Sequence, residues 1–335
     1  MTAVAITGVS GFIGDAVARR YADMGWSVRG LDLRLPDSSN PLTPNADPRV
    51  EYLVGDVTNR ADVDSLVMGA DVVVHTAALV AESGDWKVFD RVNARSPRTV
   101  ALAARQAGAR SYVHLSSVMV HGFAFPDGCD EDGPLDHAAN PYCASKIRSE
   151  FLLRGLDTPG EFNVHIIRPG DVYGPGSIPW IVRPIQHMRS NTFLYVDSPR
   201  SVINHVYVDN LVDAIETVVD TGADASGKAF IVTDGEASLN RDFYGWYADQ
   251  LGIRFAPSAP GWLAEPIAGF AAAALPESVR KRLDLDRQSI RYLRRKSAYS
   301  NARITALGWT PRVPLTEGRE RPAAWLRQVG LPPPK

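Results

Sequence analysis

A tyrosine and a lysine four residues apart are the residues of this sequence best suited to proton transfer. They lie in the stretch NPYCASK, residues 140–146. Asn is a preferred helix N-cap and Pro fits the first helical position, so the sequence predicts a helix that begins here. Residues four apart share a helix face, which brings the Lys146 ammonium near the Tyr142 phenol. That charge and the helix N-terminus both favour phenolate, so we expect a proton donor and acceptor with a lowered phenol pKa.

The same spacing occurs by chance on surface helices, so the surrounding elements decide its meaning. An apolar run at residues 4–6 leads into GVSGFIG, residues 8–14, and then into a helical pattern that ends near Gly25. A second strand is predicted over residues 27–33 and carries Asp32. The glycines would let backbone N–H groups approach a pyrophosphate, and the carboxylate would accept hydrogen bonds from a ribose diol. The N-terminal region therefore predicts a dinucleotide site.

Four further strands follow a Pro-rich loop at residues 35–48. They are predicted over residues 50–54, 72–75, 111–115 and 164–168, with helical patterns between them. This alternation predicts a parallel, doubly wound α/β sheet, in which ligands lie beyond the carboxyl ends of the strands. The residues that follow these strands are Asp56 and Val57, Ala77 and Ala78, Ser117, and Pro169 with Val172. Asp56 could bind an adenine amino group, and the small residues would let the backbone approach a cofactor.

The βα alternation weakens after about residue 170. We expect a Rossmann-type doubly wound parallel sheet with a smaller, mostly helical C-terminal substrate domain. Residues 1–169 and 204–233 would form the NAD-binding domain, and residues 170–203 and 234–335 the substrate-binding part.

Composition indicates an ordinary globular protein. The 335 residues are 45% hydrophobic and 22% charged, with a net charge of −2, so nothing global points to nucleic acid. The two cysteines, Cys129 and Cys143, have no metal-like spacing, and we expect a reducing, cytoplasmic location and no metal. No signal peptide is expected at the N-terminus. Residues 262–275 are apolar but too short to span a membrane, and Glu265 and Pro266 interrupt them.

The combination of these motifs resembles the extended short-chain dehydrogenase/reductase family over nearly the whole chain. Residues 168–176, 206–210 and 307–311 look most like its 3β-hydroxysteroid dehydrogenase branch, beside the NAD-dependent epimerases and dehydratases. The resemblance implies that Ser117 polarises the substrate oxygen, Tyr142 transfers its proton and Lys146 binds the nicotinamide ribose. It also implies a homodimer through helices at residues 86–107 and 141–154. The implied NAD contacts are Gly8, Gly11, Phe12, Ile13, Gly14, Asp32, Arg34, Asp56, Val57, Ala77, Ala78, Asn93, Tyr142, Lys146, Pro169 and Val172.

This chemistry is reasonable on physical grounds. Removing hydride from a secondary alcohol requires a base for the hydroxyl proton, and a hydroxyl donor stabilises the developing oxyanion. Asp32 would repel the 2′-phosphate of NADP, so we expect a preference for NAD that nearby Arg34 weakens.

Two residues depart from simple patterns. Pro97 lies inside the helix predicted over residues 86–107 and cannot donate to the carbonyl of Asn93. We hypothesise that this free carbonyl holds a water that links Lys146 to solvent as a proton relay; the alternative is a helix kink. His121 stands where extended family members often carry Tyr, and we expect it to line the substrate pocket without a catalytic role.

The substrate is open between alternatives. Asp171 would repel the diphosphate of a nucleotide sugar, which favours an apolar secondary alcohol or ketone of sterol-like, aryl or long-chain type. A set of apolar residues could form a lid over such a substrate or the core of a small subdomain. They are Trp262, Leu263, Ile267, Phe270 and Leu275.

A basic cluster favours the second alternative, a nucleotide-sugar 4-epimerase or dehydratase, because Arg binds diphosphates well. It comprises Arg280, Lys281, Arg282, Arg287, Arg291, Arg294, Arg295 and Lys296. Most of the cluster could instead be a solvated helix face, with some peripheral contact with anionic lipid. A third alternative, a catalytically silent NAD-sensing protein, would not need Ser117, Tyr142 and Lys146 together.

Overall fold

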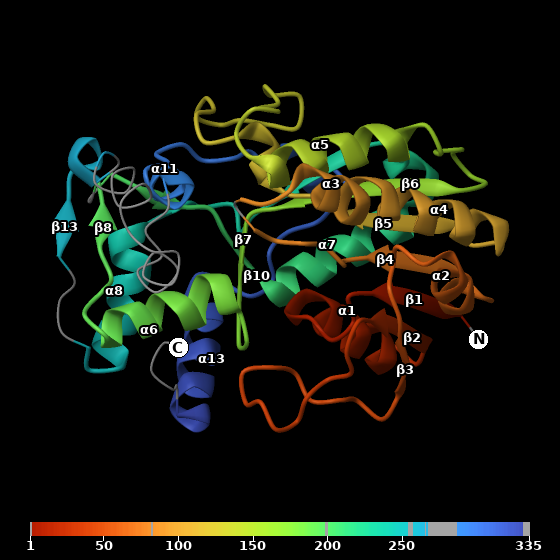
Figure 1. Ribbon diagram of the computed structural model, residues 1–335, viewed down its shortest axis with the longest axis horizontal. Helices are drawn as coiled ribbons and strands as arrows, with labels where there is room; N and C mark the ends of the chain where they lie inside the picture. The colour runs from red at the N-terminus through yellow and green to blue at the C-terminus, as the bar shows by residue number, and fades with distance from the viewer. Residues whose placement is uncertain are drawn as a thin grey trace.

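A seven-stranded parallel sheet forms the centre of the computed structural model (Figure 1). The structure describes residues 2–81, 83–197, 200–253, 257–264, 266 and 287–330. Strand β4 is the middle strand, and the order across the sheet is β11-β6-β5-β4-β1-β2-β3. The strands are β1 (Ala3–Thr7), β2 (Ser27–Asp32), β3 (Val50–Val54), β4 (Val72–His75), β5 (Ser111–Leu115), β6 (Asn163–Pro169) and β11 (Ala229–Val232). The predicted Rossmann-type sheet is confirmed, with strand ends displaced by one residue in β2 and β6.

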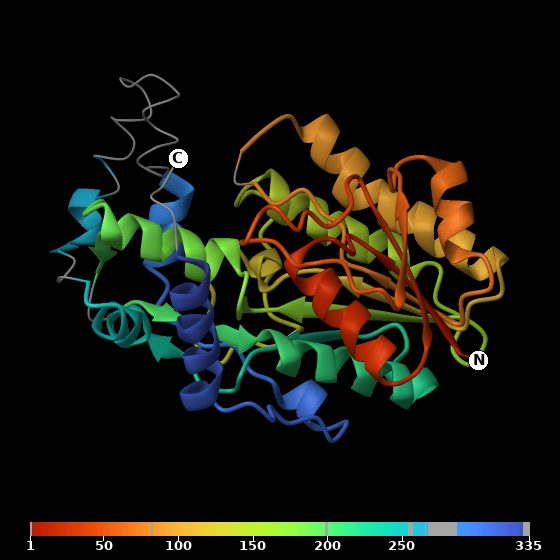
Figure 2. The ribbon, with the colours of Figure 1, turned by 90° about the horizontal axis from the view of Figure 1, so that it is seen from below.

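Helices cover both faces of this sheet, because alternate strand residues are apolar on opposite sides. Val4 and Ile6 of β1 belong to the core under α1 (Phe12–Asp23) and α7 (Val208–Thr221). Ala5 belongs to the opposite core. That core is covered by α2 (Arg60–Val67), α4 (Ser96–Gln106) and α5 (Pro141–Arg154). Figure 2 shows α2 and α4 on one side of the sheet and α7 on the other.

The helix predicted over residues 86–107 is wrong as a single α-helix. It consists of α3 (Trp86–Phe89), a π-helical turn η1 (Asp90–Arg95) and α4. In a π pattern, the N–H that Pro97 lacks would have bonded the carbonyl five residues earlier, that of Val92. The Ser96 hydroxyl donates to this carbonyl at 2.7 Å. The carbonyl that loses its backbone donor is therefore that of Val92, and the Ser96 hydroxyl donates to it instead.

The C-terminal part is mostly helical, as predicted, with short strand pairs. Strand β7 (Asp171–Tyr173) continues from β6 and pairs with β10 (His205–Tyr207). The remaining elements are the π-helical turn η3 (Ile178–Val182), α6 (Arg183–Arg189), β8 (Tyr195–Val196), β9 (Val202–Ile203), η4 (Gly222–Ala225), β12 (Ser238–Leu239), α8 (Asn240–Gln250), β13 (Ser258–Ala259), α11 (Arg287–Leu293), α12 (Ala302–Thr305) and α13 (Leu315–Val329). Within the described ranges, no helix is both long and apolar enough to cross a bilayer.

Asn210 at the start of α7 fixes the C-terminal tail to the sheet domain. Its Oδ1 accepts hydrogen bonds from the N–H groups of Arg312 and Val313, at 3.0 and 2.9 Å. Its Nδ2 donates to Asp234, and its carbonyl accepts from the Trp309 indole at 3.1 Å. The motifs at residues 206–210 and 307–311 therefore meet in space.

Candidate active site

The glycine turn after β1 lies at the point where the strand order reverses, between β1 and β4. Gly8 has a φ of +73°, and a Cβ there would lie 2.8 Å from the Ala77 nitrogen. A Cβ on Gly14 would lie 2.1 Å from the Gly8 carbonyl oxygen. Both positions therefore need glycine, which lets the turn pack against the end of β4. Such a reversal point is where ligands of open α/β sheets bind.

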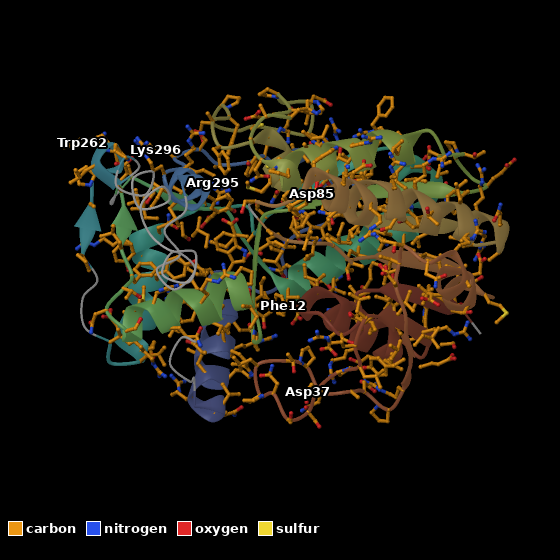
Figure 3. The ribbon with its side chains drawn as sticks, viewed as in Figure 1. Phe12, Asp37, Asp85, Trp262, Arg295 and Lys296 are labelled. Carbon is orange, nitrogen blue, oxygen red and sulfur yellow. The ribbon has the colours of Figure 1, made fainter. Side chains whose placement is uncertain are left out.

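The start of α1 suits a phosphate group. The helix begins at Phe12 with Gly11 as its N-cap, and no side chain caps its first turn. The N–H groups of a helix start lack intrahelical partners and carry partial positive charge, so they attract anionic oxygens. Phe12 and Ile13 are half-buried at this turn, and Figure 3 places Phe12 where the sheet domain meets the C-terminal part. The residues present fit the pyrophosphate of NAD.

Asp32 lies at the end of β2, beside the glycine turn. Its Oδ2 accepts a hydrogen bond from the Ser10 N–H at 3.1 Å, which holds the carboxylate in place. Arg34 is exposed, and its carbonyl accepts from the Ser10 hydroxyl at 2.8 Å. A carboxylate held here fits the diol of an adenosine ribose.

Replacing Asp32 with Ala should weaken NAD use and narrow the gap to NADP. The substitution removes the acceptor for the ribose hydroxyls and the charge that repels a 2′-phosphate. We expect the KM for NAD to rise about tenfold, the size of one or two lost hydrogen bonds to a charged group. Steady-state kinetics with both cofactors measure this. Asp37→Ala is the control, since Asp37 lies in the exposed loop after β2 and bonds Ser39 (Figure 3). Equal kinetics with both cofactors in the unmodified protein would contradict the prediction.

The other predicted cofactor residues lie at the same edge of the sheet. Asp56 and Val57 follow β3, and Asp56 Oδ1 accepts from the Thr58 N–H at 2.8 Å. Ala77 and Ala78 follow β4, and the Ala77 N–H donates to the Thr7 hydroxyl at 3.3 Å. Two more positions, Pro169 and Val172, are buried at the β6–β7 junction. Their contact with NAD remains a prediction.

The structure brings Ser117, Tyr142 and Lys146 together beyond the end of β5. Helix α5 begins where predicted, because the Asn140 side chain accepts from the Cys143 N–H at 2.8 Å. The Lys146 ammonium donates to the Leu115 carbonyl at 2.6 Å and lies 5.8 Å from the centre of the Tyr142 ring. The Ser117 hydroxyl lies near the Tyr142 phenol, where it favours the phenolate form. This arrangement could hold a substrate oxygen between two hydroxyls and move its proton.

The pKa values of this group differ from the sequence-based expectation. Removal from water raises the pKa of Tyr142 to about 12, and the nearby Ser117 hydroxyl opposes this only in part. Burial lowers the pKa of Lys146 to about 8, although the negative charge of Glu150 acts to raise it. The expected lowering of the phenol pKa is therefore wrong for the protein alone, because desolvation outweighs the nearby charges. A cationic cofactor beside the phenol would act in the opposite direction.

Asn93 holds the loop after β4 against α5. Its Oδ1 accepts from the Leu79 N–H at 2.8 Å, and its Nδ2 donates to the Leu79 carbonyl at 2.9 Å and to the Ser145 hydroxyl at 3.2 Å. The side chain therefore positions a loop next to Tyr142 and Lys146. The water relay at the Asn93 carbonyl stays a prediction.

The sequence analysis did not identify a buried ion pair that lies behind Tyr142 and Lys146. Arg168 donates to both carboxylate oxygens of Glu150, at 2.9 and 2.7 Å, and the Ser116 hydroxyl donates to the same carboxylate at 2.6 Å. Glu150 is four residues beyond Lys146, so the helical spacing that pairs Tyr142 with Lys146 could have identified it. The pair ties α5 to β6 beneath the site.

His121 belongs to this buried network. Its side chain is buried, Nδ1 donates to the Pro134 carbonyl at 2.9 Å, and Nε2 accepts from Arg168 at 3.2 Å. The expectation that it lines the pocket is wrong, because both ring nitrogens are used inside the protein. Desolvation lowers the pKa of His121, which keeps the ring neutral.

Asp171 is not a free carboxylate facing a ligand, which corrects the argument made from the sequence. It is buried, and its Oδ2 accepts from Arg295 at 2.8 Å and from the Asn204 N–H at 3.0 Å. The Tyr292 hydroxyl donates to Oδ1. Burial raises the pKa of Asp171, and the Arg295 charge opposes that shift. Its negative charge is therefore balanced within the protein.

Aromatic residues surround this pair. The Tyr292 ring lies 5.2 Å from that of Trp180 and 6.5 Å from that of Phe123, measured between centroids. No sequence signal singled out these three residues, because they come from a loop, η3 and α11. The proposed lid is described only at Trp262 and Leu263, which are 71% and 43% exposed; Ile267, Phe270 and Leu275 lie outside the described residues.

The basic cluster is also described only in part. Arg280, Lys281 and Arg282, with the side chain of Arg287, lie outside the described residues. Arg291 and Lys296 are exposed, and Arg294 pairs with Asp197 at 2.9 Å. Arg295 alone among these described side chains is buried, so the cluster is not one continuous solvated face.

Comparisons with known proteins agree on the type of chain. Residues 4–232 match the model of the NAD dependent epimerase/dehydratase family. The sequence is 29% identical over 248 residues to a 3-beta-hydroxysteroid dehydrogenase of Mycolicibacterium neoaurum, an alignment that covers 70% of this chain and 66% of that protein. It is also 29% identical over 335 residues to a UDP-glucose 4-epimerase of Mycolicibacterium smegmatis, covering 96% and 97%.

The fold is shared with solved structures of similar size. One is MoeE5 in complex with UDP-glucuronic acid and NAD, with a TM-score of 0.75, 23% identity, and coverage of 98% of this chain and 99% of that one. A dTDP-glucose 4,6-dehydratase of Streptomyces venezuelae has the same TM-score and identity, over 98% and 97%. These likenesses establish the arrangement of the sheet and the helices around it.

Proposed function

Because the chain belongs to the NAD dependent epimerase/dehydratase family, we propose that it is an oxidoreductase that interconverts a secondary alcohol and a ketone on a largely apolar substrate. NAD is the cofactor of this family. The observation that carries the redox assignment is the meeting of Ser117, Tyr142 and Lys146 at the carboxyl end of β5, at the same edge of the sheet as the glycine turn.

The residues would divide the work as follows. Ser117 donates a hydrogen bond to the substrate oxygen, and Tyr142 takes the hydroxyl proton during oxidation or returns it during reduction. Lys146 supplies positive charge that favours the phenolate, and its bond to the Leu115 carbonyl holds it there. NAD, when bound, would accept or provide the hydride.

Aromatic side chains near the Asp171–Arg295 pair support an apolar substrate. Phe123, Trp180 and Tyr292 contribute aromatic surface there, and the charge of Arg295 is balanced by Asp171. Pockets for apolar ligands are lined mainly by such side chains, with few polar groups. The similarity to a 3-beta-hydroxysteroid dehydrogenase agrees with this choice.

A nucleotide-sugar epimerase or dehydratase is the second candidate. The alignment with a UDP-glucose 4-epimerase, which covers 97% of that protein, favours it. Proton transfer by Tyr142 would be needed in such a reaction too. The two candidate functions therefore differ only in the residues that would contact the rest of the substrate.

A substrate panel tests this choice. We expect hydroxysteroids or aryl alcohols to produce NADH, followed by absorbance, because the balanced charge and aromatic wall favour uncharged apolar molecules. UDP- and TDP-sugars serve as the comparison, with sugar products analysed separately. Turnover of sugar nucleotides alone would reject the proposal. If no compound is turned over while NAD still binds, the NAD-sensing alternative replaces it.

The division into domains and the homodimer are also proposals. The first follows from the weakening of the βα alternation after about residue 170, and the second from the family resemblance. We propose that residues 1–169 and 204–233 form the cofactor domain and that residues 170–203 and 234–335 form the substrate part. We also propose a homodimer through residues 86–107, which comprise α3, η1 and α4, and through α5; Phe151 on α5 is 77% exposed, which suits a partner surface.

A further inference from the structure

Asp171 and Arg295 form a buried ion pair on the substrate side of the molecule. Both side chains are about 1% exposed, and the closest oxygen and nitrogen are 2.8 Å apart. The guanidinium also stacks on the Tyr292 ring, with its carbon 3.4 Å from the ring centroid. Its Nη1 has no hydrogen-bond partner among the described residues. One donor of a buried, neutralised arginine is therefore left unused.

The pair lies close to the catalytic turn. Tyr299, four residues after Arg295, donates to the Val118 carbonyl at 3.2 Å, and Val118 follows Ser117 directly. The ring of Phe123, from the same turn region, packs against Tyr292. On the other side, Asp171 begins β7, two residues after the end of β6. Figure 3 shows Arg295 beside α11, between the helical C-terminal part and the sheet.

We propose that Asp171 determines substrate class by neutralising Arg295, so that the pocket accepts an uncharged alcohol or ketone and rejects nucleoside diphosphates. This inference rests on the proposed function and specifies its substrate.

The charge balance explains the rejection. A diphosphate must lose its hydration to enter a buried site, and only a cation that is free to pair with it repays that loss. Arg295 is already paired with Asp171, so its charge is not available to an incoming anion. An uncharged substrate loses much less hydration on entry and needs no free cation.

Binding of UDP to the full-length protein tests the proposal by isothermal titration calorimetry. Asp171→Asn keeps the side-chain shape and an acceptor but removes the charge, which leaves the Arg295 charge unbalanced. We expect this variant to bind UDP about tenfold more tightly than the unmodified protein, the size of one hydrogen bond to a charged group. The double variant Asp171→Asn/Arg295→Met should lose the gain, since the guanidinium is then absent.

Asp197→Asn is the matched control. Asp197 pairs with the neighbouring Arg294 at 2.9 Å, and Asn tolerates its left-handed backbone, whose φ is 52°. We expect its UDP affinity to be unchanged. Thermal unfolding and NAD titration of every variant establish that each is folded.

The outcomes separate this inference from the proposed function. Equal UDP affinity in the unmodified protein and Asp171→Asn overturns the inference, and so does a gain that survives loss of Arg295. If Asp171→Asn does not fold, the unmodified protein is compared with Arg295→Met instead. Tight UDP binding by the unmodified protein that is lost in Arg295→Met also overturns the inference. Failure of every apolar alcohol to react, with the UDP gain present, rejects the proposed function alone.

Discussion

The Tyr142→Phe variant should lose about 10³-fold in turnover, because a positioned acid or base contributes roughly 10² to 10⁴ to the rate. Phe keeps the ring that packs near Lys146 but cannot hold or release the proton. Initial rates with the best alcohol of the substrate panel measure the loss. NAD titration should give nearly the same affinity as the unmodified protein, since the phenol oxygen acts on the substrate.

Tyr52→Phe is the control for this substitution. Tyr52 is half-buried in β3, and its hydroxyl accepts from the Asp47 N–H at 3.0 Å, in the loop before that strand. Its removal should leave turnover unchanged. Full activity of Tyr142→Phe would exclude Tyr142 as the proton carrier, and a joint loss of NAD binding and folding would indicate a structural role.

Replacing Arg168 with Met should destabilise the protein by about 3–5 kcal/mol, the cost of breaking a buried ion pair by removing one partner. The Glu150 carboxylate would stay buried, with the Ser116 hydroxyl and the more exposed Arg154 as its remaining partners. Urea unfolding followed by circular dichroism gives the free energy of unfolding.

Arg154→Met provides the comparison, because Arg154 pairs with the same carboxylate at 3.1 Å but its side chain is 40% exposed. Exposed pairs contribute about 0–1 kcal/mol, so this variant should be nearly as stable as the unmodified protein. If both substitutions had the same small effect, Arg168 would not be the residue that neutralises Glu150.

Local signals correctly predicted the elements expected to hold the cofactor, whose contacts with it stay a prediction. The strand, glycine turn and helix at the N-terminus depend on neighbouring residues, so they are legible in the sequence. The Asn140 cap and the spacing of Tyr142 and Lys146 likewise depend on a single helix. The phenol pKa was predicted in the wrong direction because desolvation depends on everything packed around the ring.

Long-range contacts account for what the sequence did not predict around Asp171 and Arg295. Asp171 and Arg295 are 124 residues apart, and their charges cancel only because β7 and the segment after α11 are packed together. Taken alone, the carboxylate and the basic cluster suggested opposite substrates.

By itself, the sequence determined a parallel α/β sheet, the glycine turn before the first helix and the placing of Tyr142 and Lys146 on one helix, because each follows from strand alternation, turn geometry or helical spacing. The tertiary structure decided that Tyr142 begins with a raised pKa, that His121 is enclosed by Arg168 and Pro134, and that Asp171 is paired. Burial and charge pairing between distant segments set those properties, and no local pattern records them. The Tyr142–Lys146 pair is thus a property of one helix, whereas the Asp171–Arg295 pair is a property of the fold.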